Sequence, residues 1–127
     1  MSSDKTARFM AALQILAPAD DKGLRMFKVR KQSTCVGVID ANEDGTAAVR
    51  SLVGLESAPT GRAYAMSTIC YLADVYDTCL TADGSTVLRD VGGQVSGGDW
   101  LAPFGFARTH DGDLVRLAQS LQHRRAA

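Results

Sequence analysis

The stretch from Val53 to Ala63 combines residue types that suit the binding of an anion. A strand-like run at residues 47–55 leads into it, and a helix-like run at residues 64–76 follows it. Gly61 and its small neighbours allow a tight turn between the two runs. The first N–H groups of a helix have no acceptor inside the helix, and they lie at the positive end of its dipole. We therefore expect this turn to bind an anion such as a pyrophosphate.

Other residues carry groups that react in enzymes, and each also has an ordinary structural explanation. The carboxylate of Glu56, just past the strand, suits a general base, although most glutamates are simply exposed to solvent. His110 beside Asp111 suits a base with its orienting partner, or a plain turn. The thiol of Cys79 needs a neighbouring base to act as a nucleophile, and none is apparent in the sequence. A buried structural cysteine is the favoured interpretation.

The composition is that of a single globular domain covering residues 1–127, with 46% hydrophobic and 22% charged residues. The formal net charge of zero gives no support to a nucleic-acid or anionic-membrane partner. No apolar run approaches the roughly 20 residues that span a bilayer, and the first residues lack the pattern of a secretory signal. The chain has 3 cysteines, all inside apolar runs, which predicts reduced thiols in a cytoplasmic protein. With 2 histidines and no Cys-x-x-Cys, no metal site is expected.

Apolar patterning predicts the elements that position the turn. A helix and three strands are expected in chain order at residues 5–17, 24–31, 34–41 and 46–55. Gly45 supplies the positive φ of a hairpin loop between the last two strands. The strongest helix prediction covers residues 62–77, whose apolar face is wide enough for burial against a sheet. A short strand at residues 78–82 completes a βαβ unit, so the two strands that flank this helix should be parallel neighbours.

The rest of the chain is less regular. Residues 83–99 form a long glycine-rich segment with room for one short strand at residues 86–88, and loops of this length often bind ligands. Aromatic residues gather around a proline and a glycine at residues 100–106. Residues 108–117 fit two strands that turn at Asp111-Gly112, although residues 114–121 also have helical spacing.

Two local motifs occur in this chain in a set order. Val53, Gly61 and Ala63 match, in register, a strand ending in Val-x-Pro followed by Gln/Arg-x-x-Gly-x-Gly/Ala. Residues 100–106 match Trp-Tyr-x-x-x-Gly-Phe through Trp100 and the Gly105-Phe106 pair. Together with the predicted order of elements, these motifs resemble the GNAT superfamily of acyl-CoA-dependent N-acetyltransferases, whose acyl-CoA signature is the first motif. The resemblance covers residues 24–117.

The resemblance implies an α+β fold with a mixed, mostly antiparallel central sheet and helices on both faces. It also implies direct transfer of an acetyl group from acetyl-CoA to an amine of a small molecule or a protein. The strand ending near Leu55 would splay from the strand beginning at Thr78, and the pantetheine arm of coenzyme A would pair with residues 52–55. Glu56 would be the base. The implied cofactor-binding residues are Val53, Leu55, Thr60, Gly61, Arg62, Ala63 and Tyr64.

The chain departs from the family pattern at three positions that matter for chemistry. Ala58 replaces the first Gln/Arg of the signature, and Pro59 has no N–H to offer a phosphate. Leu101 stands where a tyrosine often acts as the general acid for the leaving thiolate. These departures favour a second hypothesis, a catalytically degenerate binding or protein-interaction module of the same fold. In that case side chains should fill the gap between the two strands.

A third hypothesis is a small α+β interaction protein of another fold, forming a homodimer through an edge strand. A structure in which the strands at residues 47–55 and 78–82 are not neighbours would confirm it.

Overall fold

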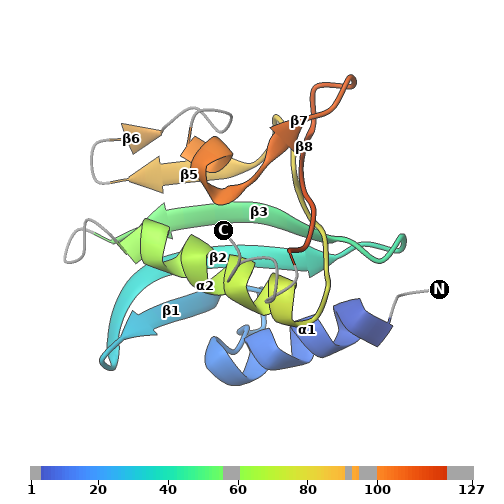
Figure 1. Cartoon of the computed structure of the whole chain (residues 1–127). Coiled ribbons are helices and arrows are strands. Elements are labelled where there is room, and N and C mark those ends of the chain that lie inside the picture. The colour runs from blue at the N-terminus through green and yellow to red at the C-terminus, as the bar shows by residue number, and fades with distance from the viewer. Residues whose placement is uncertain (1–3, 56–60, 91–92, 95–99, 120–127) are drawn as a thin grey trace.

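The computed structural model describes residues 4–55, 61–90, 93–94 and 100–119 (Figure 1). Its helices are α1 (Asp4–Leu16), α2 (Gly61–Val75) and the short 3₁₀ helix η1 (Ala102–Phe104). Its strands are β1 (Arg25–Val29), β2 (Gln32–Ala41), β3 (Ala47–Gly54), β4 (Leu80–Ala82), β5 (Val87–Asp90), β6 (Gly93–Gln94), β7 (Ala107–Arg108) and β8 (Leu114–Arg116). The chain is thus of the α+β class.

All described strands join one sheet, in the order β1-β2-β3-β4-β8-β7, with β5 beside β3 and β6 beside β5. Most neighbours are antiparallel. β3 is parallel to β4 and β5, and α2 connects it to them. The predicted βαβ unit is therefore confirmed, and these neighbouring strands give the third hypothesis no support.

Local sequence explains the two long hairpins. Between β2 and β3, Gly45 has φ 91° and its N–H donates to the carbonyl of Asn42, as the loop prediction requires. Between β1 and β2, Arg30 and Lys31 have φ angles of 52° and 70°. Two consecutive left-handed residues make the tight turn that matches the twist of a hairpin, a conformation usually given to Asn and Gly.

Both long helices pack on one face of the sheet (Figure 1), which corrects the expectation of helices on both faces. Phe9 and Leu13 of α1 share a single apolar core with Met66 and Ile69 of α2. The two helices also touch each other. This arrangement arises because the apolar stripe of α1 packs against the sheet beside α2. Within the described residues, no helix lies on the opposite face of the sheet. We call that opposite face the open face.

The C-terminal part settles two open alternatives. β5 takes the place of the short strand expected at residues 86–88. Leu114 begins a strand rather than a helix, and Leu114 and Arg116 face the core while Val115 does not. Gly112, with φ 89°, turns the chain between β7 and β8 where Asp111-Gly112 was expected to do so.

Candidate functional site

The carboxyl end of β3, where the resemblance places the pantetheine arm, is paired on both edges. On one side Val53 pairs with Val36 of β2, and the N–H of Leu55 donates to the carbonyl of Thr34 at 3.0 Å. On the other side residues 51–53 pair with residues 87–89 of β5. The expected gap between the splayed strands is therefore closed by a strand of the same chain. The register makes this possible. From the pair Ala48↔Thr81 to the pair Ser51↔Val87, β3 advances by three residues while the β4–β5 segment advances by six, so three extra residues bulge out between β4 and β5.

The start of α2 carries the remaining residues of the predicted cofactor site. Glu56 and Thr60 lie outside the described residues. Gly61 is buried, and a Cβ atom built on it would lie 2.3 Å from the carbonyl oxygen of Thr34 in β2. The glycine is thus required by close packing of helix against sheet. Ala63 and Tyr64 are exposed in the first turn, and Tyr64 keeps 52% of its surface.

Arg62 links the two sequence motifs. Its side chain is 4% exposed, and the guanidinium carbon lies 4.2 Å from the centre of the Trp100 ring. The Trp100 ring in turn packs against Phe104 with ring centres 5.0 Å apart. The sequence suggested that Arg62 reaches a phosphate, whereas the structure buries it against the late aromatic segment. A cation over an indole face is a favourable contact that fixes both groups.

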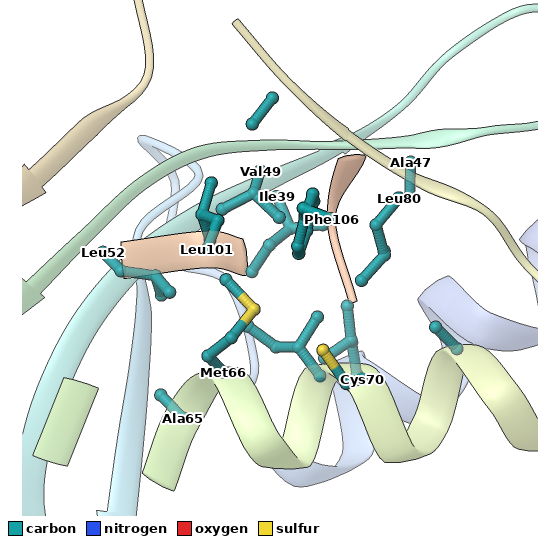
Figure 2. Packing of buried hydrophobic residues seen from close by; sticks show 14 of the residues in the cluster. Ile39, Ala47, Val49, Leu52, Ala65, Met66, Cys70, Leu80, Leu101 and Phe106 are labelled. Atoms are coloured by element: carbon teal, nitrogen blue, oxygen red, sulfur yellow. The ribbon is translucent and has the colours of Figure 1, made fainter. Parts of the chain in front are cut away.

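The late aromatic segment belongs to the hydrophobic core. Figure 2 shows Leu101 and Phe106 among the side chains of the sheet, facing Met66 and Cys70 of α2. Leu101 has 0% exposure and Phe106 has 5%. At this position many GNAT enzymes have a tyrosine that acts as general acid. In this chain the position is occupied by a leucine buried in the apolar core. The expectation that the aromatics of this segment pack rather than bind is confirmed for Phe106.

A buried ion pair that the sequence analysis missed fastens α2 to β8. Arg116 donates to both carboxylate oxygens of Asp74, at 2.8 and 3.0 Å, and their side chains are 4% and 0% exposed. Arg116 also donates from Nε to the carbonyl of Phe104 at 2.6 Å. Burial pulls the pKa of Arg116 down, but the bonds to Asp74 hold it above its ordinary value. The sequence does contain a sign of this ion pair: Asp74 lies inside a largely apolar helix, and Arg116 lies on the core side of a strand.

A hollow of about 550 Å³ lies toward the open face, between the β2–β3 and β7–β8 hairpins. Four aspartates are among its lining residues: Asp44, Asp83, Asp111 and Asp113. Hydrogen bonds from Ser85 lower the pKa of Asp83, and those from Thr46 lower the pKa of Asp44. His110 and Asp111 approach to 3.4 Å but are 94% and 73% exposed, which agrees with a plain turn. The described residues contain no cluster of His, Cys, Asp or Glu that could hold a metal ion.

The cysteines take structural positions. Cys35 and Cys70 are buried and Cys79 is partly buried, and none of the three forms a disulfide. Burial raises the pKa of the Cys35 thiol to about 11, so it stays protonated at neutral pH.

The fold is therefore of the α+β class, with helices on one face of the sheet. The gap beside β3 that was expected to admit a cofactor is occupied by β5. No protein-family model, curated protein or solved structure matches the chain. Within the part of the chain that the structure describes, no helix has both the length and the apolar character needed to cross a membrane.

Proposed function

We propose that this chain is a catalytically degenerate member of the GNAT-like fold, serving as a binding or protein-interaction module. The observation that carries the proposal is the pairing of β5 with β3 over residues 51–53. An acyl-CoA would need this edge, because its pantetheine arm pairs as an extra strand. With β2 on the other side of β3, no backbone edge of this stretch is left for the cofactor.

The side chains at the site support the same proposal. Leu101 is fully buried and cannot donate a proton to a leaving thiolate. Gly61 and Arg62 are explained by packing against Thr34 and Trp100. In sequence, Ala58 and Pro59 lack the side chain and the N–H that the signature supplies.

Release of free thiol from acetyl-CoA tests this proposal directly. The purified chain is incubated with acetyl-CoA and a broad panel of amines, including peptides with free lysines. We expect thiol release no faster than in a sample without protein. Release that depends on both protein and amine would reject the proposal.

The second candidate is an acyl-CoA-dependent N-acyltransferase with acetyl-CoA as co-substrate and an amine as acceptor. The contact between Arg62 and Trp100 favours it, because it joins the two motifs of the resemblance in space. In this case β5 leaves β3 when the cofactor binds, and Glu56 acts as base. Acetyl-CoA at 100 times its dissociation constant would then stabilise the fold by about 2.7 kcal/mol. An unchanged melting temperature at millimolar acetyl-CoA would exclude this candidate.

A further inference from the structure

The open face of the sheet is apolar across its central strands. Met26 of β1 pairs with Val36 of β2, which pairs with Val53 of β3. In the next row, Val38 pairs with Ser51, which pairs with Val87 of β5. Side chains alternate between faces along a strand, and the neighbours of these residues, such as Cys35, Leu52 and Leu88, are buried under the helices. The two rows therefore point away from the core.

These side chains are only partly covered by their own chain. Met26 is 41% exposed and Val87 is 36% exposed, and the valines between them are half-buried. A solvent-facing side of an antiparallel sheet usually alternates to polar residues. Here four valines and a methionine form adjoining rows that Ser51 alone interrupts, and an apolar patch on such a face is typical of an interaction surface.

The two ends of the open face carry opposite charge. At one end lie Lys28 and Arg89, with Arg30 and Lys31 in the hairpin turn before β2. The other end, where β2 finishes, carries Asp40 and the aspartates of the hollow described above, and these outnumber Arg50, which pairs with Asp40 at 3.4 Å. β2 has 10 residues, which places these ends about 33 Å apart at a rise of about 3.3 Å per residue.

This distribution of charge identifies the partner. A two-fold axis that crosses the strands would bring the open faces of two copies together with their strands reversed. The basic end of each copy would then oppose the acidic end of the other, while the valine rows meet in the middle. Such a contact uses the same patch on both copies, as closed symmetric dimers do. The zero net charge of the chain gives no comparable match to nucleic acid or an anionic membrane.

We propose that the open face binds the open face of a second copy of this chain, forming a symmetric sheet-on-sheet dimer. Aligned sheets pack about 10 Å apart with their side chains interdigitated. Four strands about 4.8 Å apart and about five residues long present roughly 300 Å² in projection, below the roughly 800 Å² per partner of standard stable interfaces. The dimer is therefore weak, dependent on concentration and weakened by salt. This inference rests on the proposed interaction function and names its partner.

Sedimentation velocity of the full chain, from micromolar to millimolar concentration, is the test. We expect a monomer–dimer equilibrium whose dissociation constant rises with added salt. Val38→Glu puts a carboxylate in the centre of the valine rows and should weaken the dimer by at least about tenfold, because an unpaired charge would be buried. Ile15→Glu is the matched control, since Ile15 is 86% exposed on α1, and it should leave the equilibrium unchanged.

Two charge-reversal variants provide a second test, which stays valid if Val38→Glu fails to fold. Lys28→Glu with Arg89→Glu cancels the positive charge of the basic end, where Arg30 and Lys31 remain, and should weaken the dimer. Asp40→Lys with Asp111→Lys removes most of the negative charge of the acidic end and should also weaken the dimer. An equimolar mixture of the two should form a heterodimer. A chain that is monomeric at every concentration, a Val38→Glu dimer of unchanged affinity, or a mixture that does not associate would overturn the proposal.

The two proposals fail separately. Thiol release in the acetyl-CoA assay rejects the non-catalytic function whatever the oligomeric state. A strictly monomeric chain without thiol release rejects the dimer and leaves the interaction function with another partner.

Discussion

Along β3, consecutive residues alternate between two very different surroundings. Leu52 is fully buried beneath the helices, whereas Val53 beside it is half-exposed on the open face. Both residues pair with β2 and β5, so their backbone surroundings match. The difference lies only in what covers the side chain. The covered face accounts for stability, and the open face remains available for a partner.

Among the described residues the covered face contains the buried Arg116–Asp74 pair, and breaking it should have the largest effect. Arg116→Met leaves the buried carboxylate of Asp74 without its bidentate partner. We expect a loss of about 3–5 kcal/mol in the free energy of unfolding, measured with urea at neutral pH. Lys5→Met is the matched control, because the Lys5–Asp77 pair is 60% and 65% exposed and should contribute about 1 kcal/mol or less. Equal losses in the two variants would show that burial of the pair does not matter.

The neighbouring pair on β3 compares the two faces directly. Leu52→Ala removes a fully buried side chain beside Gly37 and should cost about 2–5 kcal/mol, because a cavity remains. Val53→Ala should cost about 1 kcal/mol or less, since that side chain is already partly in water. Guanidinium unfolding at low protein concentration measures both without a contribution from association. Similar losses would mean that the open face is covered in the monomer.

The fold was predictable where periodicity is strong. The stripe of α1, the apolar helix α2 and the Asn42–Thr46 loop followed from apolar spacing and turn chemistry, and so did the parallel β3–β4 pair. Periodicity says which side of an element is apolar but not which side of the sheet it covers. The expectation of helices on both faces came from the resemblance alone, and α1 and α2 instead share one face.

The candidate site was less predictable, because it depends on pairing between distant residues. The sequence identified Gly61 but not its contact with Thr34, and Arg62 but not Trp100 as its partner. β5 was expected only as a short strand within a loop, so its pairing with β3 was missed. The open face went unnoticed because valine alternation predicts a strand equally well whichever side is covered.

Close approach on the covered face gives the next prediction. Gly61→Ala places a Cβ atom 2.3 Å from a backbone oxygen of β2, which must move. We expect a loss of about 1–3 kcal/mol in the free energy of unfolding, as for other overpacked positions. Gly84→Ala is the control, since nothing lies within 4 Å of a Cβ atom there, and it should be neutral or slightly stabilising. A harmless Gly61→Ala would leave ligand binding as the reason for this glycine.

Ionisation of Cys35 gives the smallest expected difference between the faces. Burial raises the pKa of its thiol from 9.0 to about 11, whereas the adjacent Val36 on the open face has nothing to ionise. Because the folded-state pKa is the higher one, the neutral thiol contributes its full stability below pH 9.0. That contribution is lost as the pH rises toward about 11, with about 1 kcal/mol gone by about pH 10.

Urea unfolding at about pH 8 and about pH 10, for the parent chain and for Cys35→Ala, isolates this effect. The substitution lowers stability at both values, because it leaves a small cavity. Only the parent chain should lose the additional 1 kcal/mol or so between them, since the variant has no thiol at this position. If the parent chain and Cys35→Ala respond to pH alike, the thiol of Cys35 is open to solvent, and the covered face is not closed at the start of β2.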